Sequence, residues 1–321
     1  MSDLILPELT DIMCNGLIEQ TEAERVEHEE WVHSVSVPFT LHWQDLDDNV
    51  KILQWDSNWE SFLSQRAALV EKEGRQRHLM WNLYRSLQLN WSFGYAFSQG
   101  NIGTCAMFGH LNSGHMSVLS NAFRLNRTVV QETNPSIAYA LARGNGTARW
   151  GSGANLNPML RWAAQVGNHL VADVGRYDTA GSALRHRNTA TNAKALQHQS
   201  IGIPLRSPSF EDCYAVCAAG FGINMGTHTF PTSAILNRDG LAVPHQWRNG
   251  GHAMSIIGAW ETPVDQYLYI LNSHGARYVG DSLHTGMQHG FYANRTTFAR
   301  MASNNPFRYG NWYAHLMEMG R

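Results

Sequence analysis

The sequence predicts an α+β fold in which helices come first and an antiparallel sheet follows. Helix signals dominate up to Val166, and short apolar strands separated by turn signals dominate from Gly222 onward. Between them, Arg185 to Gln199 is polar, has no strong apolar period and is expected to be an exposed connection. The 321 residues, 43% of them hydrophobic, can bury a sizeable core in one large domain or two smaller ones.

The first 90 residues are expected to form a mainly helical extension. Leu17 to His33 is rich in Glu and is typical of a polar helix. Ser57 and Glu60 have the spacing of a capping box, in which each side chain satisfies an N–H group at a helix start. A long helical pattern, broken near Gly74, is therefore predicted from Trp59 to about Leu89.

Three helices are expected in the next part of the chain, at Cys105 to about Phe123, Asn134 to Arg143, and Pro158 to Val166. The first of them contains small residues that lower helix propensity, among them Gly109 and Gly114. Their density suggests that another element packs closely against this helix.

The last third of the chain is expected to be mainly β. A short helix from Ser209 to Ala219 precedes it. Five strands are predicted from alternating or continuous apolar runs bounded by turn residues: Gly222 to Phe230, Ala253 to Trp260, Gln266 to Asn272, Gly290 to Arg295 and Trp312 to Met317.

Composition excludes several classes of protein. The net charge of −2, without a run of Lys or Arg, argues against binding to nucleic acid or to an anionic membrane surface. The first residues do not have the pattern of a signal peptide, and no stretch of about eighteen apolar residues occurs. Four cysteines are too few for a disulfide framework in a chain of this size. A cytoplasmic or virion-associated protein is expected.

A glycine-punctuated polar loop, Ser98 to Thr104, leads into Cys105 and an apolar stretch. Cys105 falls where the loop would become a helix. The unpaired N–H groups and the positive end of the helix dipole favour a thiolate there. Far downstream, His252 stands at the start of one apolar strand and Asn272 at the end of the next.

In this order, the three stretches resemble the motifs of papain-like cysteine proteases. They are Gln99-x5-Cys105, Gly251-His252-Ala253 and Asn272-Ser273-x-Gly275. The resemblance implies a two-lobed α+β peptidase domain at about residues 91–321, with a helical lobe at about 91–200 and a β lobe at about 201–321, behind the extension of residues 1–90. It also implies hydrolysis of peptide bonds in a peptide or protein substrate.

The resemblance assigns a role to each matching residue. Cys105 would be the nucleophile, His252 its base, and Asn272 the group that orients the histidine. The side chain of Gln99 and the N–H of Cys105 would form the oxyanion hole. No metal and no organic cofactor is expected. Two glycines of a loop, Gly151 and Gly153, are candidates for holding substrate by backbone hydrogen bonds, and Gly251 would leave the wall beside the histidine small.

Several positions depart from the family pattern. Ala106 replaces the bulky aromatic that usually follows the nucleophile, and His274 replaces the tryptophan that shields the His–Asn bond. Ile102 stands where secreted members carry a disulfide-forming cysteine. Tyr278 keeps an aromatic side chain where the family often has a second tryptophan.

Three alternatives stay open. The chain could be a structural or assembly protein, for example a virus or phage particle component, that keeps the fold with weak or no protease activity and makes contacts through residues 1–90. Those residues could instead be an inhibitory pro-segment. The same catalytic residues would also serve an isopeptidase or a transglutaminase-like enzyme.

Cys213 and Cys217 lie four residues apart, on one face of the short predicted helix. They could bind a metal with a histidine such as His228 or His245. The competing interpretation is a buried helix face, and it is the one we favour.

Overall fold

The computed structural model of the chain describes most of its second half and parts of its first half. The described residues are Ala23, 98–99, 103–124, 131–135, 156–175, 189–205, 207–218, 220–275, 278, 289–303 and 312–317. The extension of residues 1–90, apart from Ala23, and most of the helix expected from Asn134 to Arg143 lie outside these ranges. The division into an extension and two lobes stays a prediction.

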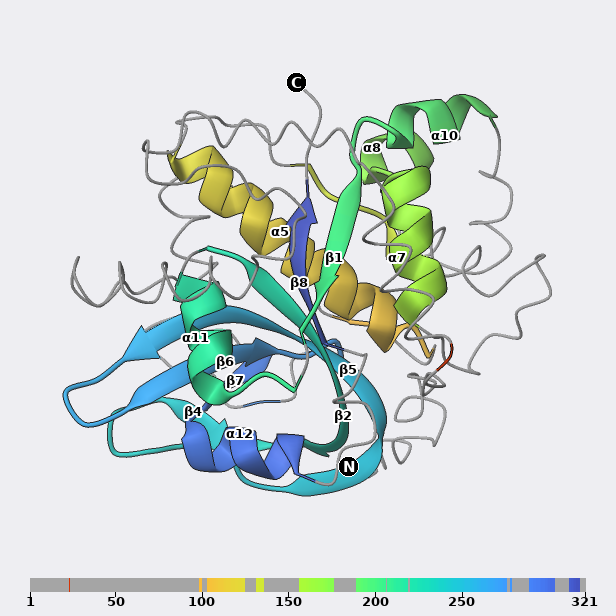
Figure 1. Cartoon of the computed structure of the whole chain (residues 1–321). Coiled ribbons are helices and arrows are strands. Elements are labelled where there is room, and N and C mark those ends of the chain that lie inside the picture. The colour runs from red at the N-terminus through yellow and green to blue at the C-terminus, as the bar shows by residue number, and fades with distance from the viewer. Residues whose placement is uncertain are drawn as a thin grey trace, which may run out of the picture.

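A six-stranded antiparallel sheet forms the centre of the molecule, with strand order β1-β8-β2-β5-β6-β7 (Figure 1). A separate two-stranded sheet pairs β3 with β4. The strands are β1 (Ser200–Pro204), β2 (Gly222–Pro231), β3 (Ala234–Leu236), β4 (Ala242–Pro244), β5 (Trp247–Glu261), β6 (Gln266–Leu271), β7 (Gly290–Ala293) and β8 (Trp312–Met317). Helices combined with an antiparallel sheet confirm the predicted α+β class.

The described helices are α5 (Cys105–Arg124), α7 (Leu156–Gln165), α8 (Val171–Val174), α10 (Thr189–Ala195), α11 (Phe210–Ala218) and α12 (Arg295–Ala302). Three of them, α5, α7 and α11, confirm predicted helices to within about two residues at each end. The expected connection from Arg185 to Gln199 contains α10, which the polar composition of the segment did not reveal. The residues of α10 are nevertheless mostly exposed or half-buried.

The sheet is covered on both faces. Successive residues of a strand point to opposite sides, and neighbours in β5 and β8 accordingly belong to different cores. Ala253 and Tyr313 pack with α5 and α7, whereas Met254 and Trp312 pack with α11 and α12. The sheet therefore lies between two layers of helices, with α5 behind it in Figure 1 and α11 and α12 in front.

Polar side chains join α5 to three neighbouring strands. The hydroxyl of Ser255 in β5 donates to the carbonyl of Gly109 at 2.9 Å. The amide of Asn224 in β2 donates to the carbonyl of Ala106 at 3.3 Å, and the hydroxyl of Ser117 donates to the carbonyl of His315 in β8. These bonds fix α5 against the middle of the sheet.

The approach of α5 to the sheet depends on small residues, as predicted. A Cβ atom on Gly109 would lie 2.5 Å from Oδ1 of Asn224, and one on Gly222 would lie 2.3 Å from the backbone oxygen of Ser113. Real Cβ contacts are not that short. Glycine is therefore required at Gly222, where the helix backbone would be hit, whereas a side chain at Gly109 would push against the Asn224 amide.

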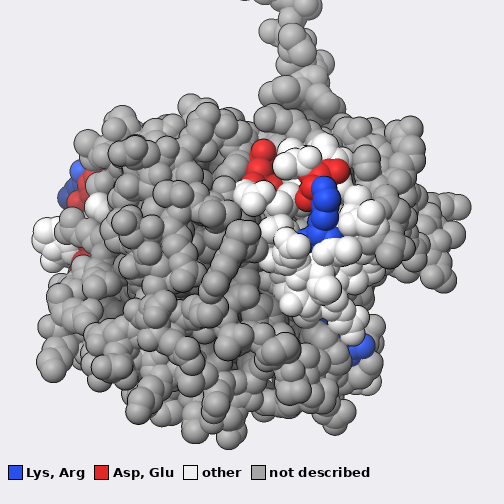
Figure 2. Space-filling model, turned by 90° about the horizontal axis from the view of Figure 1, so that it is seen from above, with Lys and Arg blue, Asp and Glu red and all other residues white. Residues whose placement is uncertain are grey.

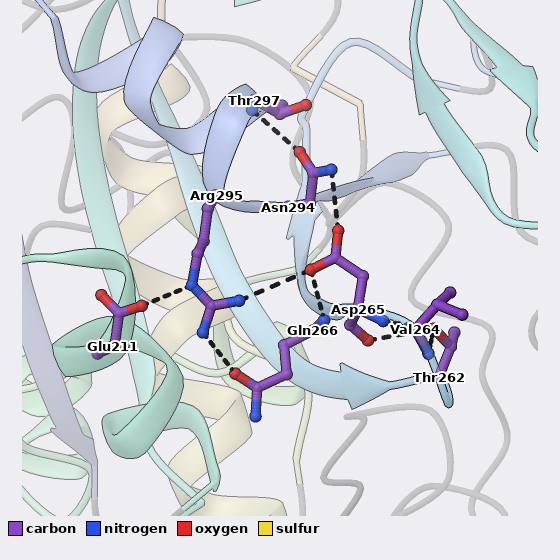
Figure 3. Close-up of polar contacts among 8 residues, drawn as sticks. All are labelled: Glu211, Thr262, Val264, Asp265, Gln266, Asn294, Arg295 and Thr297. Carbon is purple, nitrogen blue, oxygen red and sulfur yellow. Dashed lines mark hydrogen bonds and ion pairs between the residues drawn. The ribbon is translucent and has the colours of Figure 1, made fainter.

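Strand β7 ends before the predicted Arg295 because Asn294 begins a helix instead. The Asn294 side chain accepts a hydrogen bond from the N–H of Thr297 at 3.1 Å, which is an N-cap contact. Arg295 then reaches sideways from α12: its Nε donates to Glu211 of α11 at 2.6 Å and its NH2 group to Gln266 of β6 at 2.8 Å (Figure 3). The start of α12 thus ties three elements together.

Charge on the described surface is of mixed sign. Helices α8 and α10 lie at the top of Figure 1, and Lys194 of α10 pairs with Asp173 of α8 at 2.5 Å. Figure 2, seen from above, shows acidic and basic side chains of the described residues in contact on that face. Within the described ranges, no helix is both long and apolar enough to cross a membrane.

Candidate active site

Cys105 is the first residue of α5. The carbonyl of Thr104 accepts hydrogen bonds from the N–H groups of Met107 and Phe108, at 3.0 and 3.1 Å, which marks the start of the helix. The N–H of Cys105 belongs to the first turn, whose N–H groups have no acceptor within the helix. The predicted position of the cysteine at a helix N-terminus is therefore confirmed, and the positive end of the helix dipole lies at the thiol.

His252 and Asn272 meet because of the register between β5 and β6. Ser255 pairs with Leu271, and continuing that antiparallel register places His252 across from His274. Asn272 is then the diagonal neighbour of His252, within reach of a long side chain. Nε2 of His252 lies 2.8 Å from Oδ1 of Asn272, a hydrogen-bond distance.

Gln99 is held against the same segment. Its N–H donates to the carbonyl of Ser273 at 2.7 Å, and the hydroxyl of Ser273 donates to its side-chain oxygen Oε1 at 2.6 Å. Ser98 forms an isolated antiparallel bridge with His274. Because Oε1 accepts from Ser273, the Nε2 group of Gln99 is directed elsewhere as a donor.

The amide of Asn272 is contacted at both ends. Oδ1 accepts from the N–H of Ser273 at 2.7 Å in addition to its contact with His252. Nδ2 donates to the hydroxyl of Tyr278, and that hydroxyl donates to the carbonyl of Pro231 at 2.8 Å. The backbone N–H of Asn272 donates to the carbonyl of His289 at 2.9 Å. The side chain is thus oriented by both its oxygen and its nitrogen.

Two rings contact the imidazole of His252. His274 stacks on it with ring centroids 4.3 Å apart and planes 22° apart. Phe230, at the end of β2, contacts it with centroids 4.6 Å apart at 44°. His274 therefore takes the predicted place of the shielding tryptophan. Phe230 and Pro231 were not among the predicted site residues, because nothing in the local sequence distinguishes the end of β2 from any other strand end.

The four predicted catalytic residues are buried. Gln99, Cys105, His252 and Asn272 each have 0% exposed surface. Burial lowers the pKa of His252 to about 4, although the hydrogen bond to Asn272 acts in the opposite direction. The ring is therefore neutral at pH 7. Its Nδ1 atom makes no hydrogen bond within the described part of the chain.

The predicted substrate-binding glycines have different outcomes. Gly251 lies in β5, directly before His252, and is buried. Gly151 and Gly153 lie outside the described residues, so their role stays a prediction.

Cys213 and Cys217 of α11 are fully buried in the core between that helix and the sheet. The thiol of Cys217 contacts the carbonyl of Ile256 at 3.8 Å, and burial raises its pKa. The interpretation as a buried helix face is confirmed. No group of three His, Cys, Asp or Glu side chains that could hold a metal occurs in the described ranges, so the alternative metal site with His228 or His245 has no support.

Comparison with known proteins finds similarity at the level of structure. No protein-family model and no curated protein matches the chain. Xylellain, a cysteine protease from Xylella fastidiosa, is similar over 76% of this chain and 86% of its own, with 12% identity and a TM-score of 0.49. The Carica candamarcensis cysteine protease CMS1MS2 in complex with E-64 is similar over 70% and 92%, with 13% identity and a TM-score of 0.40.

The digestive procathepsin L2 proteinase from Tenebrio molitor larval midgut is similar over 87% of this chain and 99% of its own. Its identity is 12% and its TM-score 0.40. These three solved structures are two cysteine proteases and one procathepsin proteinase.

Proposed function

We propose that this chain is a papain-like cysteine peptidase that cleaves peptide bonds through a thioester at Cys105. One observation carries the proposal: His252 bonds through Nε2 to Asn272 and keeps Nδ1 as its unbonded nitrogen among the described residues. A neutral imidazole with one nitrogen fixed by an amide oxygen has the arrangement of a general base. The hydrogen bonds that hold Gln99 beside Ser273 support an oxyanion-binding role for its Nε2 group.

The proposed reaction begins when Nδ1 of His252 takes the proton from the thiol of Cys105. The sulfur attacks the substrate carbonyl carbon, and the carbonyl oxygen becomes an oxyanion that accepts hydrogen bonds from Gln99 Nε2 and from the N–H of Cys105. The imidazolium then gives its proton to the leaving amine as the C–N bond breaks. Water, deprotonated by the same imidazole, cleaves the thioester and regenerates the thiol.

The reaction class depends on which nucleophile, water or an amine, takes the acyl group from the thioester. If an amine reaches the thioester before water, a new amide bond forms and the enzyme is transglutaminase-like. The neutral, buried imidazole can assist either reaction, since it needs only to remove a proton from the attacking water or amine. Hydrolysis is the proposal, and product analysis in the presence of an added primary amine distinguishes the two.

Burial of the site favours a second candidate, a structural or assembly protein with weak or no protease activity. The thiol of Cys105 and the ring of His252 have no exposed surface. A peptide can reach the sulfur only after the covering atoms move. A protein that kept this arrangement only as part of its core would have the same burial and would never admit a substrate.

Covalent labelling tests both candidates. The native chain is incubated with an epoxide that traps papain-like nucleophiles, over a time course long enough for a buried site to open, and the modified residue is mapped by mass spectrometry. The peptidase proposal predicts stoichiometric labelling at Cys105, its loss in His252→Ala, and no modification of Cys213 or Cys217, which serve as internal controls. No labelling at Cys105 over the whole time course, in chain shown to be folded, would overturn the peptidase proposal in favour of the second candidate.

A further inference from the structure

We propose that the hydroxyl of Tyr278 is a positioning group for His252 that acts through Asn272. By holding the Asn272 amide in one orientation, it keeps the proton of the neutral imidazole on Nε2 and leaves Nδ1 as the basic nitrogen. The inference rests on the proposed function for its effect on catalysis, but the orientation itself can be measured without activity.

The orientation follows from a backbone carbonyl that can only accept a hydrogen bond. The carbonyl of Pro231 lies 2.8 Å from the Tyr278 hydroxyl, so the hydroxyl proton points to Pro231. The phenol oxygen then offers its lone pair, and the group that donates to it is Nδ2 of Asn272. With Nδ2 engaged there, Oδ1 faces Nε2 of His252 at 2.8 Å and must accept a proton from it.

The opposite orientation of the Asn272 amide would favour the other tautomer of the His252 imidazole. If the Asn272 amide were turned, Nδ2 would face Nε2, which would then have to accept a hydrogen bond and carry no proton. The neutral ring would hold its proton on Nδ1, where it could not take one from a thiol. The N–H of Ser273 also donates to Oδ1. Tyr278 therefore adds a second restraint, at the nitrogen end of the amide.

The hydroxyl is well placed to transmit this restraint. Tyr278 follows β6, whereas Pro231 ends β2, so the two hydrogen bonds of the phenol link segments that are far apart in the sequence. Its side chain is 3% exposed and contacts Phe291 of β7, with ring centroids 5.6 Å apart. Removal of the hydroxyl alone leaves this ring contact available, so Tyr278→Phe isolates the hydrogen bonds.

A double-mutant cycle tests whether Tyr278 acts through Asn272. In the wild-type background we expect Tyr278→Phe to lower kcat/KM about 3- to 10-fold. This is the size of effect expected when the Asn272 amide loses the hydrogen bond that holds its nitrogen end. In the Asn272→Ala background the same change should have less than about a 2-fold effect, because the amide to be oriented is absent. An equal loss in both backgrounds would show a merely structural role and would overturn the proposal.

The imidazole tautomer gives a readout that is independent of activity. Long-range ¹H–¹⁵N spectra of the full chain with labelled histidine, with His252 assigned by difference from His252→Gln, should show Nε2 protonated in the wild type. Tyr278→Phe should populate the Nδ1-protonated form. Tyr267→Phe serves as the control: it removes another buried phenol, whose hydrogen bond to Asn237 lies outside the site, and should leave the His252 signals unchanged.

The outcomes separate this inference from the proposed function. Epoxide labelling of Cys105 in the wild type, with an unchanged His252 tautomer in Tyr278→Phe, would overturn the inference and leave the function standing. A tautomer change in Tyr278→Phe, with no labelling of wild-type Cys105, would support the positioning role and overturn the peptidase. Thermal melts of each variant establish that the comparison is made on folded protein.

Discussion

The imidazole of His274 lies parallel to that of His252, with ring centroids 4.3 Å apart and planes 22° apart. The contact agrees with the β5–β6 register, since extending it beyond its last pair, Ser255 with Leu271, brings the two histidines opposite each other. His274 is 5% exposed, and it also contacts Phe230, with centroids 5.9 Å apart. His274 therefore covers one face of the imidazole that makes the hydrogen bond to Asn272. A flat ring at position 274, rather than an indole in particular, can make this stack.

Position 274 should therefore tolerate an aromatic ring and reject a small side chain. We expect His274→Ala to lower kcat/KM about 10-fold, because water would compete for the hydrogen bond between His252 and Asn272. His274→Phe should retain activity within about 3-fold, since it keeps the stacked ring. Steady-state kinetics on a fluorogenic peptide provides the measurement. Equal losses in the two variants would show that an imidazole nitrogen, and not the ring, is what matters.

The packing of α5 on β2 should depend on the absence of a side chain at Gly222. A Cβ atom there would lie 2.3 Å from the Ser113 backbone, which cannot rotate away. We expect Gly222→Ala to lower the free energy of unfolding by about 2 kcal/mol or more and to lower activity as α5 is displaced from the sheet. Urea denaturation supplies the free energies.

Gly202→Ala is the matched control for that substitution. Its Cβ would lie 2.7 Å from Cδ2 of Leu160, a methyl group at the end of a flexible side chain. It should therefore be less destabilising than Gly222→Ala. A larger loss of unfolding free energy in Gly202→Ala than in Gly222→Ala would contradict the prediction. It would show that the close approach of the α5 backbone is not the reason that β2 needs glycine.

Arg295 should stabilise the junction of α11, α12 and β6 through its shape as well as its charge. Its guanidinium donates to Glu211 and Gln266 and lies over the Phe210 ring, 4.8 Å from the centroid. Arg295→Lys keeps the charge but cannot make this fork of hydrogen bonds. Since Arg295 and Glu211 are 49% and 61% exposed, solvent screens the pair, and we expect a loss of only about 0.5–1 kcal/mol. Urea denaturation of Arg295→Lys should be compared with Arg238→Lys, an exposed arginine between β3 and β4, which should leave the midpoint unchanged.

Much of the fold could be predicted from the sequence because its elements have strong local signals. Strand β8 matches the prediction from Trp312 to Met317, and α5 begins at the predicted Cys105. Weaker local signals gave errors. Helix α10 is short and mostly polar, so its stability depends on contacts with distant residues. The only local signal for α12 is its N-cap residue Asn294, which also fits the end of a strand.

The candidate site was predictable in its residues but not in its supporting contacts. The motifs around Cys105, His252 and Asn272 are local in sequence, and the β5–β6 register brings the last two together. The contacts of Phe230 with His252, and of Pro231 with Tyr278, join positions separated by many residues. Such pairings depend on how the strands are ordered in the sheet, which no local pattern specifies.

A second group of buried histidines lies away from the candidate site, between α5 and β8. The rings of His110 and His315 are edge to face with centroids 4.6 Å apart, and both are fully buried. Nε2 of His110 lies 3.0 Å from the hydroxyl of Ser200, which also accepts from Asn168. Nε2 of His115, five residues further along α5, lies 3.0 Å from the hydroxyl of Thr133. Ser200, Asn168 and Thr133 are neutral side chains, so none of these partners offers a counter-charge to an imidazolium.

This group should make the stability of the chain fall on mild acidification. Burial lowers the pKa of His110 and of His115 to about 4, and that of His315 well below its usual value of 6.5. Because the unfolded chain binds protons at a pKa of about 6.5 and the folded chain does not, stability is fully present above pH 6.5 and is lost as pH falls from there toward 4. His110 and His115 should each remove about 2 kcal/mol of unfolding free energy between pH 7 and pH 5, although their coupling makes the losses non-additive.

Urea denaturation at pH 7 and pH 5 measures this dependence. His110→Gln keeps a polar group near Ser200 but cannot take up a proton, so it should reduce the difference in unfolding free energy between the two pH values by about 2 kcal/mol. His245→Gln removes an exposed histidine and should leave the difference unchanged. Equal wild-type stability at the two pH values would mean that the buried rings find a counter-charge on protonation. If His245→Gln reduced the difference in unfolding free energy as much as His110→Gln, the pH dependence could not be assigned to the group formed by His110, His115 and His315.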